Sequence, residues 1–184
     1  MASPSPVAIH TSSSGRDSFT VHLKDVLRRA AQHKGTAYVE IYQNCNIFND
    51  HAFTYMTDKE VRDDATLYLE HGKPMVFGKN KDKGIRMRGT EMEVIQFGNG
   101  LSADDCIVWD ETVDNPATAF MVSQLVPPHF PTPVGVFRSV EAPTYEERVS
   151  DQDHQEVAKK GPGDLDKLIH SGDIWTVHPD HSIS

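Results

Sequence analysis

Cys45 is the residue in this sequence whose type and position most clearly suggest chemistry. It lies in a polar loop that begins at Gln43, directly after the β-branched and aromatic stretch Thr36–Tyr42. That stretch predicts a β-strand buried on both faces or nearly so. Proteins of the α/β class place ligands and cofactors at the carboxyl ends of such strands. The Cys45 loop is therefore the first candidate for a functional site.

Spacing alone leaves three interpretations of the Cys45 thiol open. Most free cysteines are buried and inert, and the same interpretation suits Cys106. A zinc site that used His51 would lack the cysteine and histidine pairs typical of such sites. An iron–sulfur cluster needs about four cysteines, whereas the sequence holds two. Spacing therefore favours an inert thiol over a metal ligand.

Other motifs that could carry chemistry are weak. The sequence has no Gly-x-Ser-x-Gly elbow, no Gly-Lys-Ser/Thr P-loop and no His-Glu-x-x-His pair. Gly98-Asn-Gly100 lacks the third glycine of a dinucleotide-binding motif and predicts a turn. Carboxylates that are neighbours in sequence point apart, so three acidic pairs predict solvated surface rather than acid/base dyads: Asp63-Asp64, Asp104-Asp105 and Glu146-Glu147.

One basic concentration stands out in an otherwise acidic sequence. It comprises the loop Gly78–Gly84, which contains three lysines, and the following Arg86 and Arg88. A solvated hairpin tip is the favoured interpretation. Docking of an acidic partner is the functional alternative, because local positive charge steers encounters.

Composition limits the class of protein. The 184 residues suffice for one domain with a core, and the formal net charge of −9 argues against nucleic-acid or membrane-surface binding. Ten histidines are scattered singly. Two cysteines favour a reducing compartment, and neither a signal peptide nor a membrane-spanning run is visible. We expect a soluble, cytoplasmic α/β protein.

The elements that position Cys45 begin with a helix. Its start is predicted at Asp17 or Ser18 and its end at Gly35. Its apolar face is predicted from helical spacing to comprise Phe19, Leu23, Val26, Leu27, Ala30 and Ala31. A helix, a glycine and a strand form one half of a βαβ unit. Only a Ser/Pro-rich leader precedes this helix, with a possible short strand at 7–9, so the fold is expected to begin partway through.

The rest of the sequence predicts shorter elements. A helix is expected around 58–68, and three strands at 75–77, 85–87 and 93–97 should form an antiparallel meander. Further along we expect a possible strand at 106–109, a helix opened by Pro116 and a strand at 134–137. The predicted organisation is a flexible leader (1–17), a partial α/β domain with the appended meander (18–140) and an extended polar tail (141–184).

Several stretches in order along the chain resemble one family. They are Ala31–Asp50, Tyr68–Gly78, Val134–Arg138, Pro143–Glu147, Gly163–Leu168 and Ser171–Val177. Together they resemble the beta subunit of 2-oxoacid:ferredoxin oxidoreductases, especially the 2-oxoglutarate type, over roughly residues 18–177. The resemblance is to the carboxyl-terminal half of that subunit only, which accounts for a fold that begins partway through. It implies that residues 18–140 are the carboxyl-terminal part of a doubly wound α/β domain of the thiamine-diphosphate-binding type.

The resemblance implies thiamine diphosphate chemistry. A 2-oxoacid such as 2-oxoglutarate adds to the thiazolium carbon and loses CO2, its electrons pass through a [4Fe-4S] cluster to ferredoxin, and the acyl group passes to coenzyme A. Cys45 matches the last of the four cluster ligands. The other three, and the Gly-Asp-Gly motif that holds Mg2+ and diphosphate, belong to the half that this sequence does not resemble.

The resemblance is incomplete at the loop itself, where Asn46 and His51 stand in positions at which the family commonly has Pro and Gly. We expect a fragment of a beta subunit that binds no cofactor and is inactive alone, with no catalytic residue assignable. Its expected partners are the alpha subunit, ferredoxin and a separate amino-terminal half. A non-catalytic docking or scaffold module is the alternative.

Overall fold

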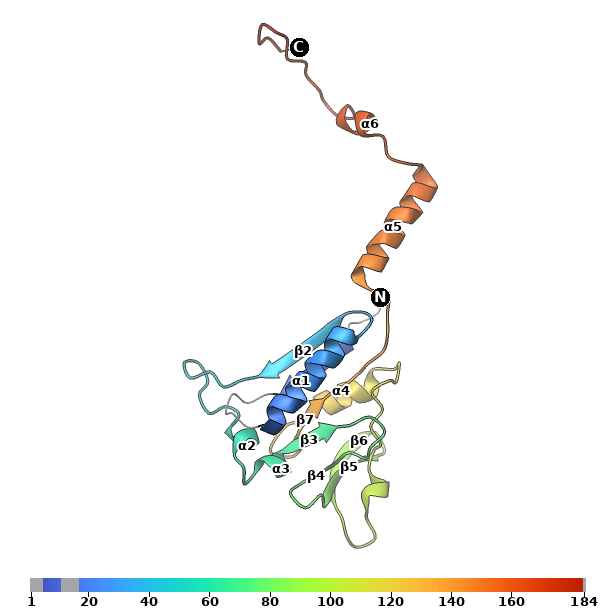
Figure 1. The fold of residues 1–184 in the computed structure, drawn as a ribbon. Helices are drawn as coiled ribbons and strands as arrows, with labels where there is room; N and C mark the ends of the chain where they lie inside the picture. Colours follow the sequence, from blue (N-terminus) through green and yellow to red (C-terminus); the bar gives the residue numbers. More distant parts are fainter. Residues whose placement is uncertain (1–4, 11–16, 184) are drawn as a thin grey trace. The chain divides into compact units, whose positions relative to one another are not determined.

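A computed structural model describes residues 5–10 and 17–183 of the chain (Figure 1). The chain divides into two compact units, Met1–Pro143 and Thr144–Ser184, which are described separately below. The first unit is a mixed α/β structure that contains two small sheets, and it holds every strand longer than an isolated bridge in the described ranges.

The main sheet has four strands in the order β2-β1-β7-β3. β1 (Ser5–His10) lies parallel to β2 (Ala37–Tyr42), and β3 (Thr66–Leu69) lies parallel to β7 (Thr132–Gly135). The two pairs meet where β1 and β7 run antiparallel, so the sheet is mixed rather than wholly parallel.

The helix α1 (Asp17–Gln32) joins β1 to β2, and together they complete a βαβ unit. Residues 5–10, which lie within the expected flexible leader, therefore form a strand. Backbone pairing runs the full length of the strand, from Ser5 opposite Ala37 to His10 opposite Tyr42. The sequence suggested a possible short strand at 7–9, and the observed strand β1 is longer and includes Ser5 and Pro6.

The helix α1 covers one face of the main sheet. Val26 is 2% exposed and packs with Val136, Leu23 and Val39. His22 meets the ring of Tyr68 edge-on, with 5.4 Å between the ring centroids, and burial lowers the pKa of His22 below its ordinary value. Of the predicted apolar face, Leu23, Val26 and Ala30 are covered, whereas Leu27 is 40% exposed and Ala31 is also exposed, so the buried stripe is narrower than the spacing predicts.

Strand β2 is exposed, and the expectation of a strand buried on both faces is wrong for this chain. Tyr38 is 55% and Ile41 is 44% exposed. β2 forms one edge of the sheet, with β1 as its neighbour on one side. A β-branched and aromatic composition is typical of a buried strand. The described residues of the first unit place no segment over the exposed side chains of β2.

The main core lies on the other face of β3. Leu67 and Leu69 alternate with Tyr68 and therefore point away from α1. They pack with α4 (Ala117–Ser123) and with a three-stranded antiparallel sheet, β4 (Val76–Phe77), β5 (Lys83–Arg88) and β6 (Glu91–Gln96). The predicted meander and the helix after Pro116 are thus confirmed.

Two other sequence-based expectations need correction. Instead of one helix over 58–68, there are two single turns, α2 (Thr54–Thr57) and α3 (Arg62–Ala65), followed by β3. Three of the four residues of β3 are buried, namely Thr66, Leu67 and Leu69. The segment 106–109 is extended but pairs as an isolated bridge at Val108, after the 3-10 turn η1 (Ala103–Asp105). Trp109 anchors it by donating its indole N–H to the carbonyl of Val136 at 2.9 Å.

The second unit contains helices, so the expected extended tail is also corrected. α5 (Tyr145–Lys160) begins with a capping box, in which Thr144 and Glu147 each accept a hydrogen bond from the other's backbone N–H. It ends before Gly161 with two lysines in its last turn. A shorter helix, α6 (Leu165–Ile169), follows. None of the described helices is long and apolar enough to cross a membrane.

Candidate functional site

The loop that carries Cys45 leaves the carboxyl end of β2, as the sequence predicts, and it is held closed by Asn44. The Asn44 side chain donates to the carboxylate of Asp50 and to the side chain of Asn46, both at 2.7 Å, and accepts the backbone N–H of His51 at 2.9 Å. Inside this clamp, the backbone N–H of Asn49 donates to the carbonyl of Cys45 at 3.0 Å. The loop is therefore a defined turn built around the thiol.

Backbone amides face the sulfur of Cys45. Hydrogen bonds from the backbone of Phe48 and of Ile47 hold the pKa of Cys45 below its ordinary value, with Asp50 as a weaker opposing charge. Cys45 is partly exposed, whereas Cys106 is buried and burial raises its pKa. Because the thiolate is the form that attacks electrophiles and binds metals, Cys45 is the more reactive of the two thiols.

This difference gives a test by alkylation. We expect Cys45 to react with iodoacetamide faster than Cys106 in the folded chain, and its rate to reach half-maximum at a lower pH than that of an unstructured cysteine. The sign follows from the lowered pKa, since the thiolate population then appears at lower pH. Peptide mass spectrometry after timed labelling measures both rates. A Cys45 profile that coincides with the profile in the urea-unfolded chain would contradict the role of the loop amides.

His51 takes a left-handed backbone conformation, with φ of +63°. Glycine adopts this conformation without a steric penalty, which explains physically why a glycine suits the position. The His51 ring lies beside Asp50, with 3.3 Å between Nε2 and a carboxylate oxygen, and both groups are exposed.

Replacing His51 with glycine should therefore stabilise the loop modestly. We expect the free energy of unfolding to rise by up to about 1 kcal/mol, because relief of the left-handed strain exceeds the added freedom of glycine in the unfolded chain. Urea denaturation monitored by circular dichroism measures the change. A lower unfolding midpoint for His51→Gly would show that the lost contact with Asp50 and the added freedom of the unfolded chain together outweigh the backbone strain.

Two large apolar side chains project from the Cys45 loop into solvent. Ile47 is 85% and Phe48 is 89% exposed. The loop's base is supported by Tyr42 and Phe53, whose rings stack with 5.0 Å between centroids. Exposed apolar side chains next to a thiol, above an uncovered strand edge, are typical of a surface that another protein segment covers.

The other sequence candidates have structural roles. The Cys106 sulfur lies over Gly84, where an added Cβ would approach it to 2.2 Å. Gly98 and Leu101 close a turn through reciprocal backbone hydrogen bonds. The acidic pairs do not form dyads: Asp64 pairs with Lys83 at 2.9 Å, Asp105 belongs to the capping box of η1, and Glu147 caps α5. The interpretation of these pairs as surface carboxylates is thus confirmed.

The described residues also provide no complete metal site. No group of three or more His, Cys, Asp or Glu side chains converges on a common point in residues 5–10 and 17–183. His51 is directed at Asp50 and joins no second histidine. Cys45 is therefore available to contribute one ligand, and the remaining ligands of any metal centre must come from other residues.

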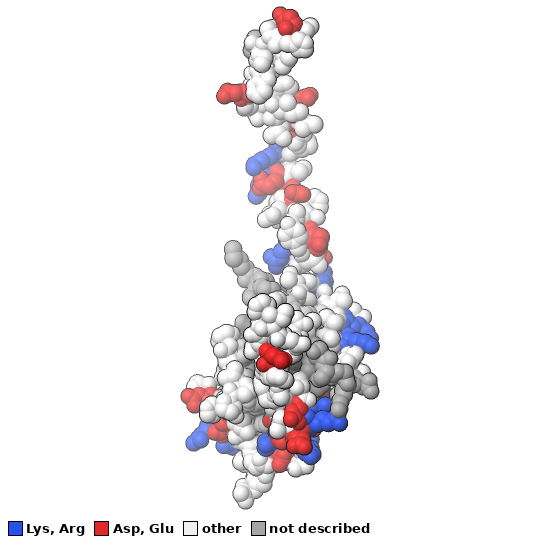
Figure 2. Space-filling model, turned by 90° about the vertical axis from the view of Figure 1, so that its left-hand side faces the viewer, with Lys and Arg blue, Asp and Glu red and all other residues white. Residues whose placement is uncertain are grey.

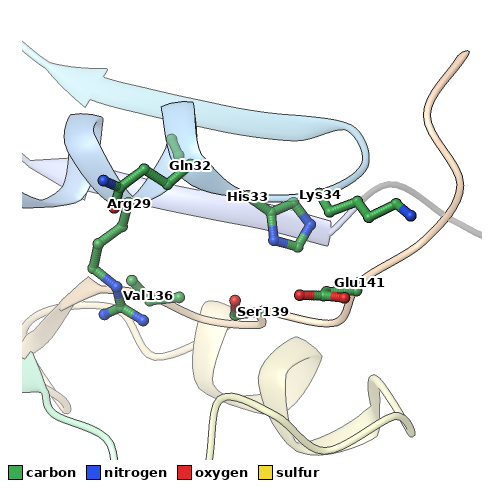
Figure 3. Close-up of a pocket in the computed structure, with 8 residues that line it drawn as sticks. Arg29, Gln32, His33, Lys34, Val136, Ser139 and Glu141 are labelled. Carbon is green, nitrogen blue, oxygen red and sulfur yellow. The ribbon is translucent and has the colours of Figure 1, made fainter. Parts of the chain in front are cut away.

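A separate cavity, which the sequence did not indicate, opens at the carboxyl end of α1 (Figure 3). Its volume is about 280 Å³. It is lined by Arg29, Ala30, Gln32, His33, Lys34, Val136, Ser139 and Glu141. The helix α1 runs antiparallel to β2, so its carboxyl end lies near the amino end of β2. Cys45 follows the carboxyl end of β2, so the cavity and Cys45 lie at opposite ends of this strand.

The charges around this cavity largely compensate one another. Arg29 forms an ion pair with Glu111, which is only 6% exposed. His33 and Lys34 lie across the opening from Glu141 (Figure 3). No thiol lines the cavity. Arg29 and Glu111 are 82 positions apart, so no local pattern could have revealed their pairing.

Comparison with known proteins identifies one curated relative. The chain is 39% identical over 158 residues to the 2-oxoglutarate oxidoreductase subunit KorB of Mycobacterium tuberculosis strain H37Rv. The match covers 84% of this chain but 42% of the relative, so the chain spans less than half of that protein's length. No family model matches the chain, and no solved structure matches it. The predicted resemblance to a 2-oxoglutarate oxidoreductase subunit is confirmed as a partial match.

Proposed function

We propose that this chain is the carboxyl-terminal part of a 2-oxoacid:ferredoxin oxidoreductase beta subunit, with Cys45 as one ligand of its [4Fe-4S] cluster. The single observation that carries the proposal is the 39% identity to a 2-oxoglutarate oxidoreductase subunit over 84% of this chain. The complete enzyme would convert 2-oxoglutarate to an acyl-CoA and CO2 and pass the electrons to ferredoxin.

The Cys45 loop suits a single cluster ligand. Its sulfur is accessible, and the amides of Ile47 and Phe48 stabilise the thiolate over the thiol. Hydrogen bonds to cluster sulfurs also tune reduction potential. Cys106 is buried beside Gly84 and contacts Ser102 rather than the Cys45 loop. The described residues thus fit one ligand position and not the whole cluster.

The same reasoning extends to thiamine diphosphate. A diphosphate held through Mg2+ needs convergent oxygen ligands, and the described residues converge on no such point. We therefore propose that the thiamine diphosphate, the Mg2+ and the other three thiolates are held by a segment outside this sequence. Thiamine diphosphate, when bound there, supplies the carbanion-stabilising centre for decarboxylation.

Complementation tests the proposal. The chain is expressed with the alpha subunit and with the segment of the KorB subunit that it does not match, and purified anaerobically. We expect reduction of ferredoxin that depends on both 2-oxoglutarate and coenzyme A, and none from the chain alone. Stable assembly of all three components with no oxoacid-dependent reduction would contradict a catalytic role.

The alternative function is a docking or scaffold module without catalysis. Two observations favour it: β2 exposes Tyr38 and Ile41, and Ile47 and Phe48 project from the loop that follows it. Such a surface binds a partner whether or not a cluster forms. The complementation experiment separates the two functions, because a scaffold would assemble with the alpha subunit equally well when Cys45 is replaced by serine and would give no turnover in either case.

A further inference from the structure

The main sheet of the first unit has a narrow joint at its centre. Every residue of β1 pairs with β2, and every residue of β3 pairs with β7. Among residues 5–10 and 17–183, the two halves share one backbone pair, Ala8 with Gly135. Because so little backbone pairing joins the β2–β1 half to the β7–β3 half, side-chain packing must supply much of the connection.

Helix α1 belongs to the β2–β1 half and supplies this packing. His22, Val26 and Arg29 are spaced at i, i+4 and i+7, so they share one face of the helix. Each meets a partner outside the βαβ unit: Tyr68 in β3, Val136 after β7 and Glu111. One stripe of α1 therefore bridges the joint.

His22 is the member of this stripe whose charge changes near neutral pH. Its Nδ1 is buried, and the described part of the chain gives it no hydrogen-bond partner. Burial lowers the pKa of His22 and raises the pKa of Tyr68, so the phenol against which the ring packs stays neutral. A protonated ring would place an N–H at Nδ1 where no acceptor receives it. The packed state therefore favours neutral His22.

The charged groups near His22 compensate a proton on its ring only in part. Asp25 on α1 and Glu70 after β3 both attract such a charge and oppose the larger effect of burial. Asp25 lies 3.6 Å from Arg28, and Glu70 pairs with Lys73. Both carboxylates are more than half exposed, and water screens the attraction of exposed charges. Burial therefore determines which form of the ring is packed.

We propose that His22 makes this joint acid-sensitive, so that protonation of its ring loosens α1 from the β7–β3 half of the main sheet. A solvated imidazole binds a proton at pH values below about 6.5. Opening therefore takes up a proton as the pH falls from about 6.5 toward the lowered pKa of His22, and acid favours the open form. The half that carries α1 also carries β2 and the Cys45 loop, so the response reaches the candidate site. The inference does not depend on the proposed enzymatic function.

Exposed charges provide a background that a control variant can measure. Acidic and basic side chains are interspersed on the visible face of the chain (Figure 2). Exposed ion pairs contribute little to stability, and exposed carboxylates change charge mostly below about pH 5. His71 is the matched exposed histidine, since its side chain is 51% exposed and lies 3.4 Å from Asp110. Its protonation requires no opening of the joint.

Two measurements on the full chain test the proposal. By NMR, the His22 ring should titrate at a lower pH in the folded chain than in the urea-unfolded chain. By hydrogen exchange, corrected for the intrinsic rate, the protection of α1 relative to β5 and β6 should fall by up to about tenfold for each pH unit below about 6.5, because opening takes up one proton. A His22 titration at or above that of the unfolded chain would overturn the proposal. So would a ratio of protection factors that does not change with pH.

Substitutions assign the response to one ring. His22→Phe should remove the loss of α1 protection in acid, because phenylalanine keeps an aromatic contact with Tyr68 and binds no proton. His71→Gln should retain the response of the unmodified chain. Circular dichroism checks that both variants fold, and His22→Gln carries the same expectation if His22→Phe does not. An unchanged acid response without His22, or its loss in His71→Gln, would reject the role of His22.

Discussion

Replacement of Gly135 by alanine is expected to destabilise the first unit by about 3 kcal/mol or more. Gly135 lies in β7 at the centre of the main sheet, paired with Ala8 on one side and Leu69 on the other. Its φ is +125°, which L side chains rarely adopt, and an added Cβ would lie 2.8 Å from the carbonyl oxygen of Leu69. That oxygen belongs to the backbone of a buried strand, so it cannot move aside cheaply.

Gly98→Ala is the matched control for this prediction. Gly98 has a similar φ of +116°, but an added Cβ would meet no atom within 4 Å. This variant should lose only the conformational part of the effect, about 1–2 kcal/mol. Urea denaturation of both variants measures the difference. If both variants lose the same free energy of unfolding, the backbone around Leu69 relaxes to accommodate the added Cβ. The steric contact would then not explain the destabilisation at Gly135.

Local patterns predicted the helix before the Cys45 strand and the hairpin of the smaller sheet. The helical spacing centred on Val26 and the stop at Gly35 identified α1, and alternating apolar residues between glycines identified the hairpin β5–β6. These signals are reliable because each element buries one face against the same unit. The position of Cys45 after a strand followed directly.

Features that depend on distant partners could not be predicted. The β-branched and aromatic composition of β2 is typical of a buried strand. Its exposure in this structure depends on which other segments of the chain lie beside it, and composition does not show that. Helix α5 was missed for a different reason, since it has no apolar stripe. Its capping box at Thr144 and Glu147 was a usable local signal. The clamp formed by Asn44 required three-dimensional coordinates, because asparagine in a loop has many possible partners.

The exposed loop and the exposed strand edge have a common physical explanation. Tyr38, Ile41, Ile47 and Phe48 all lie on β2 or in the loop that follows it. Tyr38 and Ile41 point to opposite faces of the strand, so a segment that buries both must wrap around this edge of the sheet. The same segment would exclude water from the Cys45 sulfur, and a drier surrounding is one of the factors that set a cluster's potential. Protein assembly and ligand chemistry are therefore expected to be coupled at this edge of the sheet.

The largest functional effect is expected from Cys45→Ser in the complemented enzyme. Under the proposed function Cys45 is one of four cluster thiolates, so its loss should abolish the visible iron–sulfur absorption. Ferredoxin reduction should fall to the background level, because the proposed electron path runs through that cluster. Cys106→Ala is the control: this buried thiol contacts Gly84 and Ser102 rather than the Cys45 loop, so the spectrum should persist with a modest loss of stability. Iron content and absorption of anaerobically purified protein provide the measurement. A Cys45→Ser enzyme with an unchanged spectrum would show that Cys45 is not a ligand, even if the complemented enzyme itself is active.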